Sequence, residues 1–216
     1  DTKGQKLILN GYKRDNYQRE MALKFLKNIN DEDWIIINDI DEIPNLEKVN
    51  FTDNKNDLIF FKQQIYFYKF NLHYPTSPWF GSRACMKKNF ISPQWLRDVK
   101  QKKYPFWRFD TLFSKKKYQN IKYINDGGWH FTNIKTPENI LKKLLNYTHH
   151  DEFEKSGIGI EILKEKITEK KAIYDHSVDQ RDNKWNSQTK LNKIDLNKMP
   201  DYLRRNYKKY SDWLEL

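Results

Sequence analysis

Three carboxylates lie within four residues of this chain: Asp39, Asp41 and Glu42. Negative charges this close repel one another unless a cation or solvent compensates them. In an extended segment the two aspartates project the same way and can address one ion or its bound waters. Carboxylates, waters and phosphate oxygens suit Mg²⁺ or Mn²⁺. The pattern predicts a divalent metal held by Asp39 and Asp41 together with a diphosphate; a solvated acidic turn is the alternative.

A second candidate segment surrounds a pair of glycines. Gly127 and Gly128 are adjacent in a chain with only seven glycines, and such a pair permits positive φ and close approach of the main chain to a ligand. Next to the pair, Asp126 is a candidate base, Trp129 can pack on a sugar or a nucleobase, and His130 can bind a metal or donate to a phosphate. A buried histidine beside a turn is the structural alternative.

The apolar run Trp34–Ile37 must position the acidic cluster, because it comes directly before it. A short, continuously apolar run is typical of a strand buried on both faces, as in a parallel sheet. Ligands of open α/β sheets bind beyond the carboxyl ends of the strands. The carboxylates are therefore predicted to lie at a ligand-binding edge.

Strands and helices are mixed along the rest of the chain, which predicts an α/β class. Helical spacing and capping residues predict helices over 15–29, from Ser92-Pro93 to Val99, from Thr136-Pro137 onward, over 158–171 and from Pro200 onward. Aromatic and β-branched residues predict one or two strands over 58–72 and short strands over 107–124, while 176–198 is expected to be a surface loop.

The composition limits the kinds of partner that this chain can have. The 216 residues suit one domain, and the aromatic share of 15% supports a core although hydrophobic residues reach only 38%. The net charge of +11 suits polyanionic partners or diphosphate-bearing substrates, although it is also compatible with compositional bias. A single cysteine, Cys85, excludes a disulfide framework within the chain. No apolar run approaches the ~20 residues that span a bilayer.

Several segments together resemble glycosyltransferase family seventeen, which includes the β-1,4-mannosyl-glycoprotein β-1,4-N-acetylglucosaminyltransferases. The long aspartate motif and the Gly-Gly-Trp-His segment are far more specific than Asp-x-Asp alone. The similarity covers most of residues 11–214 and rests on the segments Arg14–Arg19, Ile36–Pro44, Ser92–Arg97, Gly127–Phe131 and, more loosely, Tyr147–Phe153.

The resemblance implies a GT-A-like α/β fold with a mixed central sheet. It also implies a nucleotide-sugar donor, UDP-N-acetylglucosamine in the characterised branch, a glycan acceptor, Mn²⁺ or Mg²⁺ as cofactor, and inversion at the anomeric carbon. Residues 1–216 would be one glycosyltransferase domain that is incomplete at its N-terminus, since about ten residues, enough for one strand around Leu7–Leu9, precede the first matching segment. The compartment would be the cytoplasm for a bacterial or viral enzyme and the Golgi lumen for a eukaryotic one.

The implied chemistry assigns roles to few residues. A metal on Asp39 and Asp41, with His130 completing its shell by analogy, would neutralise the leaving diphosphate. Arg83 would assist as a positive charge, and Gly127, Gly128 and Trp129 would contact the donor. A carboxylate must accept the acceptor's proton. We favour Asp126, and the other candidates for this base are Glu42, Asp151 and Glu152.

Two other functional classes remain open. A basic nucleic-acid-binding module is supported weakly by the charge and the interleaved aromatic residues, although the acidic cluster would repel a phosphate backbone; we therefore expect no nucleic-acid partner. A metal-dependent phosphohydrolase would cleave the donor quickly without an acceptor. The aromatic run at 66–79 is either an acceptor platform or core, and the triple lysine Lys115–Lys117 either meets phosphates or is a solvated turn.

Overall fold

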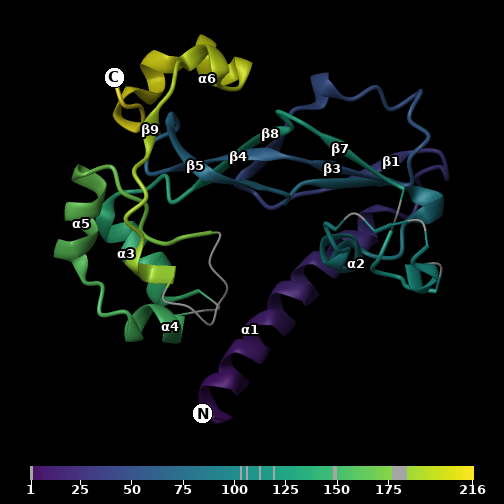
Figure 1. Cartoon of the computed structure of the whole chain (residues 1–216), viewed down its shortest axis with the longest axis horizontal. Helices are drawn as coiled ribbons and strands as arrows, with labels where there is room; N and C mark the ends of the chain where they lie inside the picture. Colours follow the sequence, from purple (N-terminus) through teal and green to yellow (C-terminus); the bar gives the residue numbers. More distant parts are fainter. Residues whose placement is uncertain are drawn as a thin grey trace. The chain divides into compact units, whose positions relative to one another are not determined.

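The computed structural model describes residues 2–102, 104–105, 107–111, 113–118, 120–147, 150–176 and 184–216. They form a mixed α/β structure with two mixed sheets (Figure 1). The α/β class predicted from the sequence is therefore confirmed, and a GT-A arrangement stays a prediction. The chain divides into two compact units: unit 1 comprises residues 1–12, 64–78 and 129–216, and unit 2 comprises residues 13–63 and 79–128.

Unit 2 is built on a four-stranded sheet with the order β1-β6-β3-β7. Its strands are β1 (Trp34–Ile37), β3 (Leu58–Phe61), β6 (Arg83–Met86) and β7 (Ile121–Ile124). Strand β6 pairs antiparallel with both β1 and β3, whereas β3 pairs parallel with β7. Alternate residues of a strand face opposite sides of a sheet, so the central strand β3 supplies two separate cores.

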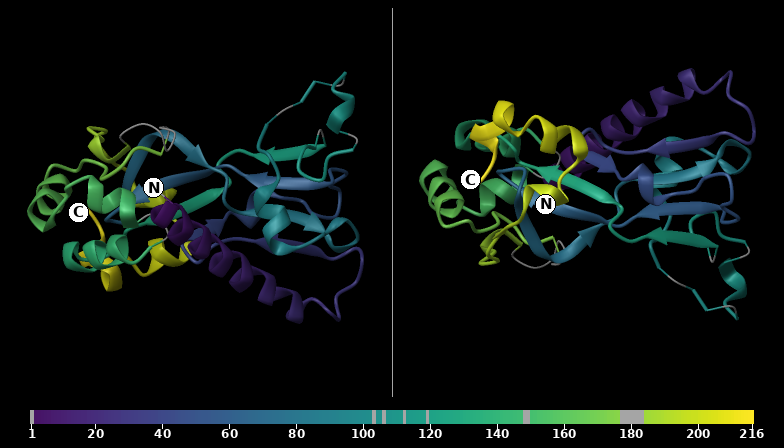
Figure 2. Two further views of the ribbon diagram at one scale, coloured as in Figure 1. Left: turned by 90° about the horizontal axis from the view of Figure 1, so that it is seen from below. Right: turned by 90° about the horizontal axis from the view of Figure 1, so that it is seen from above.

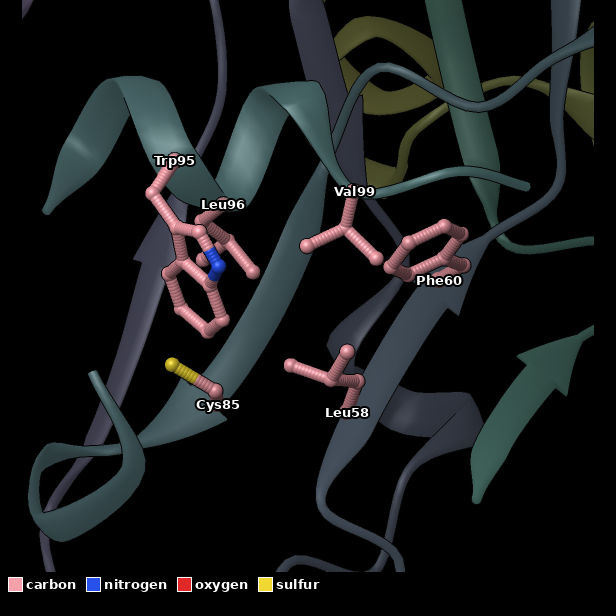
Figure 3. Packing of buried hydrophobic residues seen from close by; sticks show 6 residues of the cluster. All are labelled: Leu58, Phe60, Cys85, Trp95, Leu96 and Val99. Carbon is pink, nitrogen blue, oxygen red and sulfur yellow. The ribbon is translucent and has the colours of Figure 1, made fainter. Parts of the chain in front are cut away.

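Both faces of this sheet are covered. Leu58 and Phe60 of β3 pack with Cys85 against α2 (Pro93–Asp98), whose side of the core is formed by Trp95, Leu96 and the following Val99 (Figure 3). On the opposite face, Ile59 and Phe61 pack with Ala84 and Ile124. The four residues of β3 are fully buried, which explains why its sequence is continuously apolar.

Unit 1 contains most of a second sheet, whose order is β2-β8-β4-β5-β9. Strands β4 (Gln63–Phe67) and β8 (Gly128–Thr132) run parallel, and β5 (Leu72–Trp79) pairs antiparallel with β9 (Asn192–Lys193). The helices of this unit are α3 (Pro137–Leu145), α4 (His150–Lys155), α5 (Ile160–Thr168) and α6 (Asp201–Arg205). One of its cores joins Tyr66 and Phe131 of the sheet to Met199 and Leu203 near the C-terminus.

The remaining elements are a long N-terminal helix, a short strand and seven 3₁₀ helices: α1 (Thr2–Glu20), β2 (Glu42–Pro44), η1 (Met21–Phe25), η2 (Leu46–Lys48), η3 (Lys87–Asn89), η4 (Phe109–Thr111), η5 (Lys184–Asn186), η6 (Leu196–Lys198) and η7 (Tyr207–Trp213). Across the described part of the chain, every helix is too short or too polar to cross a membrane.

Two helix starts were predicted correctly from their capping residues. Ser92 Oγ accepts a hydrogen bond from the Trp95 N–H at 3.2 Å, and Pro93 is the first residue of α2. Thr136 Oγ1 accepts from the Asn139 N–H at 3.4 Å at the start of α3. In both cases the serine or threonine before the proline is the N-cap of the helix, as the sequence indicated. The two strands expected within 58–72 are β3 and β4.

The N-terminal prediction was partly wrong: helical structure does cover 15–25, but its bounds differ from those predicted. The segment 7–9 is helical and not a strand, and the helix expected over 15–29 begins at Thr2, gives way to η1 after Glu20 and ends at Phe25. An apolar run of three residues cannot distinguish strand from helix. The surrounding lysine, glutamine and arginine residues favour the helix.

The environment of β1 also differs from the prediction. This strand pairs antiparallel with β6 at one edge of its sheet, and only Ile35 is buried among its residues. The short strands expected over 107–124 reduce to β7 within the described residues, because 107–118 forms a loop with η4. Aromatic residues favour strands where they pack on a half-buried surface, and Trp107, Phe109 and Phe113 of this loop are exposed.

Near the C-terminus, the single predicted helix from Pro200 is α6 followed by η7, with Asn206 between them in a non-helical conformation. The predicted surface loop 176–198 is partly wrong as well. Residues 177–183 lie outside the described residues, but Trp185, Ser187 and Leu191 are buried. The aromatic run of β4 and β5 is core rather than platform, since Tyr66, Phe67, Tyr68 and Tyr74 are at most 2% exposed.

Candidate functional site

The loop after β1 is held in shape by its own hydrogen bonds. The Glu42 N–H donates to the Asp39 carbonyl oxygen at 3.0 Å and closes a turn around Ile40 and Asp41. The Asp39 N–H donates to Glu42 Oε2 at 2.9 Å. Asn38 Nδ2 donates to the carbonyl oxygens of Asp39 and Glu42 at 3.1 and 3.0 Å. The polar side chains of the acidic motif thus fix the conformation of the loop that carries them.

Glu42 anchors this loop from the inside. Its side chain is buried, with 2% of the residue exposed. Trp79 Nε1 donates to Oε1 at 2.6 Å, and Arg97 Nη1 donates to Oε2 at 2.8 Å. Gly81 leaves the necessary space, because a Cβ at that position would overlap the Glu42 carboxylate. A buried carboxylate is tolerated when a charge partner and hydrogen bonds compensate its lost hydration, and Glu42 has both.

Asp39 shares the same arginine. Arg97 Nη2 donates to Asp39 Oδ2 at 2.8 Å, and Arg19 Nη2 lies 3.2 Å from Asp39 Oδ1. Arg97 comes from α2 and Arg19 from the end of α1, so two helices hold one loop. We call Arg19, Asp39, Glu42 and Arg97 the arginine–carboxylate cluster. Its two positive and two negative charges balance, so the mutual repulsion of the carboxylates is compensated by the protein itself.

The tip of the loop carries the two residues between these anchors. Ile40 is fully exposed, at 103% of its reference surface, and Asp41 is half-buried. One apolar and one acidic side chain are therefore presented on a main chain held by buried contacts. Such a fixed support is what a binding group needs if it is to keep its orientation.

The glycine turn lies directly against the strand that follows the acidic loop. The Asn45 N–H donates to the Gly127 carbonyl oxygen at 2.8 Å, and the Gly127 N–H donates to the Lys62 carbonyl oxygen at 2.9 Å. Gly128 has a φ of 129°, and a Cβ there would overlap the carbonyl oxygen of Ile43. Only glycine fits this position. The fold thus brings the two sequence motifs together inside unit 2.

Asp126 occupies the turn that connects β7 to this glycine pair. It is exposed and has a positive φ of 49°. Aspartate is among the residues that adopt this left-handed conformation in turns. The side chain is thus on the surface of unit 2 next to Gly127, where a substrate can reach it.

Arg83, predicted to contact the donor, is directed at the main chain instead. Its Nη1 donates to the carbonyl oxygens of Leu96 and Val99 at 3.0 and 2.7 Å, at the C-terminal end of α2. The guanidinium also lies 4.4 Å from the centre of the Phe60 ring. Burial lowers the pKa of Arg83 to about 10. These contacts stabilise the helix end, and donor binding by Arg83 stays a prediction.

Trp129 and His130 belong to unit 1, whereas Asp39 and Asp41 belong to unit 2. Trp129 Nε1 donates to the Lys198 carbonyl oxygen at 2.8 Å, so the indole takes part in the packing of the C-terminal segment. His130 is 6% exposed, and its ring centre is 6.2 Å from that of His176. Both side chains take part in the packing of unit 1, and their predicted roles in donor and metal binding stay predictions.

The contacts of the acidic loop bear on whether a metal ion fits there. Among the residues that the structure describes, no group of three or more His, Cys, Asp or Glu side chains is placed to hold a metal. Both oxygens of Asp39 accept from arginines. A cage made by the protein alone therefore does not fit. Mg²⁺, however, is commonly held by one or two carboxylates plus substrate phosphates, and Asp41 with Asp39 suits a cation that arrives with a diphosphate.

The last matching segment is only partly described, since Thr148 and His149 lie outside the described residues. His150 Nδ1 is 3.1 Å from the Tyr147 carbonyl oxygen. The two candidate bases form ion pairs: Asp151 with Lys155 at 2.6 Å and Glu152 with Lys184 at 2.8 Å.

The sequence did not indicate how the acidic loop is held. Arg19 and Arg97 lie within the matching segments, yet their partners are far away along the chain, and neither spacing nor composition identifies them. Trp79 and Gly81 belong to none of the motifs recognised in the sequence. One general signal was available: a carboxylate cluster after an apolar strand needs compensating charge, and arginine is the residue best suited to bind two carboxylates at once.

Comparisons of the chain with known protein families, with curated proteins and with solved structures found no significant match.

Proposed function

We propose that this chain is a glycosyltransferase that uses a nucleotide-sugar donor, whose diphosphate binds at the loop that carries Asp39 and Asp41. The observation that carries the proposal is the hydrogen bond between Asn45 N–H and the Gly127 carbonyl oxygen, at 2.8 Å. It joins the two segments on which the resemblance to family seventeen mainly rests. A diphosphate bound to the acidic loop would therefore have the glycine turn beside it.

The charges of the loop support a diphosphate with its cation. Asp41, together with Asp39, would hold Mn²⁺ or Mg²⁺, which supplies a Lewis acid that neutralises the leaving diphosphate. Arg19 and Arg97 hold the Asp39 carboxylate in one orientation. Because these contacts exist before any ligand binds, little reorganisation is needed when charge develops on the leaving group.

For the acceptor's proton, Asp126 is a better base than Glu42. Asp126 is exposed and adjoins the glycine turn. Both oxygens of Glu42 already accept hydrogen bonds from Trp79 and Arg97. A base must lie within hydrogen-bond reach of the hydroxyl that it deprotonates. We assign the base to Asp126 and a positioning role to Glu42.

The finer proposal is a GT-A arrangement, UDP-N-acetylglucosamine as donor, a glycan hydroxyl as acceptor and inversion of the anomeric carbon. It is supported by the family-seventeen motifs and by the mixed α/β architecture. His130 and Trp129 are retained as donor-side residues on the strength of the motif alone.

The test is a screen of nucleotide sugars for thermal stabilisation in Mn²⁺ and in EDTA, followed by transfer assays with the donor that responds. A bound donor at a hundred times its Kd stabilises the folded state by about 2.7 kcal/mol. We expect one nucleotide sugar to raise the Tm in Mn²⁺ only. Asp41→Asn should abolish this response and lower transfer at least a hundredfold, on the order of losing one essential charge-stabilising group.

Two further variants sharpen the assignment. Asp126→Asn should lower kcat by about a hundredfold or more while donor-dependent stabilisation is kept. Asp31→Asn removes an exposed carboxylate elsewhere in unit 2 and should leave both measurements unchanged. The proposal is wrong if no nucleotide sugar stabilises the chain, or if Asp41→Asn transfers sugar normally. Fast donor cleavage that is independent of an acceptor would identify a phosphohydrolase instead.

A further inference from the structure

A loop of unit 2 exposes three large aromatic side chains within seven residues. Trp107, Phe109 and Phe113 are 60%, 70% and 89% exposed. They lie between α2 and β7, and we call the described residues of 101–118, which are all but 103, 106 and 112, the aromatic loop. Large apolar side chains clustered on a surface mark an interaction site, whereas single exposed ones do not. The loop follows α2 in the chain and projects from the rest of unit 2 in both views of Figure 2.

The same loop is strongly basic. The described residues of the aromatic loop include five lysines and arginines against one aspartate, a net charge of +4. Exposed basic side chains flank the aromatic ones on both sides: Lys102 before them, and Lys115 and Lys116 after them. Aromatic residues that enter an apolar layer and basic residues that stay at its charged surface are the combination found at membrane interfaces.

The single acidic residue among the described positions of the loop is neutralised within it. Asp110 lies 2.7 Å from Arg108 Nε and 2.6 Å from Lys117 Nζ. These two bonds hold the pKa of Asp110 well below its usual range. The Asp110–Lys117 pair also links the 3₁₀ helix η4 to the later part of the loop. Asp110 therefore does not oppose the approach of an anionic surface.

Positive charge continues to the base of the loop. An open pocket of about 330 Å³ lies there, and its lining includes Arg83, Arg97, Lys100 and Lys116, with Asp98 as the one acid. Arg97 is balanced by Asp39 and Glu42, and Lys116 is paired with Asp98 at 2.6 Å, so the net positive charge of this lining comes from Arg83 and Lys100. The loop thus combines exposed apolar side chains with positive charge where it joins the rest of unit 2.

We propose that the aromatic loop docks this protein on a membrane surface that contains anionic lipids. Trp107, Phe109 and Phe113 insert into the interface, while Lys102 and Lys115 lie against the headgroups. A single-stranded nucleic acid also binds aromatic and basic residues, but it does so in a groove that follows its backbone. The aromatic residues here are on a projecting loop, which suits a flat and deformable partner better.

The test is flotation of the whole chain with vesicles. Wild-type protein should float with vesicles of phosphatidylcholine and phosphatidylglycerol and not with phosphatidylcholine alone, and about 0.5 M salt should release it, since screening at that concentration is strong over a few ångströms. The triple variant Trp107→Ser, Phe109→Ser, Phe113→Ser should lose more than tenfold in partition coefficient. Lys102→Glu with Lys115→Glu should lose at least as much, because each basic residue near such a surface contributes about fivefold.

Matched controls carry the same changes elsewhere. Tyr17→Ser, Phe25→Ser and Tyr202→Ser together remove three aromatic side chains that are at least 61% exposed. Lys142→Glu with Lys193→Glu reverses two exposed charges in unit 1. Both controls should float like wild type.

Three results would overturn the proposal: equal flotation of the loop variants and their controls, equal binding to neutral and anionic vesicles, or binding of a single-stranded oligonucleotide without binding of vesicles. Far-UV circular dichroism of each variant shows that a loss of flotation is not a loss of fold.

Discussion

The two units bury polar groups in opposite ways. Unit 2 buries full charges: Glu42 is 2% exposed and is paired with Arg97, which also binds Asp39. Unit 1 packs histidine and aromatic rings at its centre, and its buried Lys166 donates to the Ser187 carbonyl oxygen at 2.7 Å rather than to a carboxylate. The ring centre of His176 lies 4.9 to 5.6 Å from those of Tyr174, Phe67 and Tyr74, and 6.2 Å from that of His130.

The difference bears on which of the two units has a polar cluster that packing alone does not explain. A buried ion pair is often no more stabilising than an apolar pair of the same volume, so the arginine–carboxylate cluster is poorly explained by stability alone. It fixes a loop whose tip remains accessible. The ring cluster of unit 1, in contrast, is explained by packing. The comparison therefore favours a ligand site in unit 2 and a mainly structural role for the centre of unit 1.

The strongest way to break this comparison is Arg97→Ala. It leaves the buried Glu42 carboxylate without its cation, and we expect a loss of about 3–5 kcal/mol from the free energy of unfolding. Chemical denaturation measures the total, and hydrogen exchange of β3 and β6 locates the loss in unit 2. Lys88→Ala, which removes an exposed partner of Glu32, should cost less than about 1 kcal/mol.

A double-mutant cycle tests whether charge is the cause. Glu42→Gln removes the charge and keeps one of the two acceptor oxygens, so its amide oxygen can serve either Trp79 Nε1 or the Asp39 N–H but not both. In that background Arg97→Met should cost at least about 1 kcal/mol less than it does alone, because contacting residues couple by that amount or more. Equal costs in both backgrounds would mean that Arg97 acts by packing.

The second prediction concerns the contact between the two motifs. Gly128→Ala places a Cβ against the Ile43 carbonyl oxygen at a φ of 129°. We expect a destabilisation of about 3 kcal/mol from overlap and backbone strain together. Gly159→Ala, with open space around the new Cβ, is the control; because Gly159 is the N-cap of α5, this change should cost no more than about 1 kcal/mol. If donor binding survives Gly128→Ala in the folded fraction, the contact is structural only.

The third prediction concerns how the stability of the two units changes as the pH falls. Burial and the neighbouring His130 lower the pKa of His176 from 6.5 to about 3. A histidine with a depressed pKa is neutral in the folded state, so its contribution is complete above pH 6.5 and is lost as the pH falls toward 3. The loss is on the order of 2 kcal/mol after allowance for partial exposure.

This loss should appear in β4 and β8 of unit 1, measured by hydrogen exchange at pH 7 and pH 4. His176→Phe removes the titrating group from a ring-lined position and should flatten most of the dependence on pH. The pKa of His73 is also lowered, mainly by burial, so a smaller slope is expected to remain. A variant with the full wild-type slope would show that another group is responsible.

Local sequence signals predicted this fold well where one residue type decides the structure. The helix starts at Ser92-Pro93 and Thr136-Pro137 follow from capping chemistry, and the strand of β1 follows from its apolar run. The segment 7–9 failed because three apolar residues fit a helix as well as a strand. The strand order, the antiparallel pairing of β1 and the loop at 107–118 depend on partners distant in the sequence.

The candidate site shows the same division. The acidic loop and the glycine turn were visible as motifs, and the contact between them was not. Glu42 was predicted as a base from its type alone, whereas its surroundings depend on Trp79 and Arg97, which come from two other elements. Arg83 was predicted to bind donor phosphates, whereas its guanidinium donates to main-chain carbonyl oxygens at the end of α2. Residue type indicates what a group can do, and only packing determines which partner it has.

The smallest expected effects come from two equivalent positions, one in each unit. Ser92→Ala and Thr136→Ala both remove an N-cap acceptor, which typically costs about 1 kcal/mol. Ser92 also donates to Glu20 Oε1 at 2.7 Å, which ties α2 to the end of α1 beside Arg19. The bond at Thr136 is long, at 3.4 Å. We therefore expect Ser92→Ala to cost about 1–2 kcal/mol and Thr136→Ala no more than about 1 kcal/mol. Ser92→Ala should also weaken donor-dependent stabilisation, because it loosens a helix that holds Asp39, whereas Thr136→Ala should not. Denaturant titrations and the thermal screen on both variants measure these effects. A larger cost at Thr136, or equal effects on donor binding, would contradict the view that the helices of unit 2 are tied to its acidic loop.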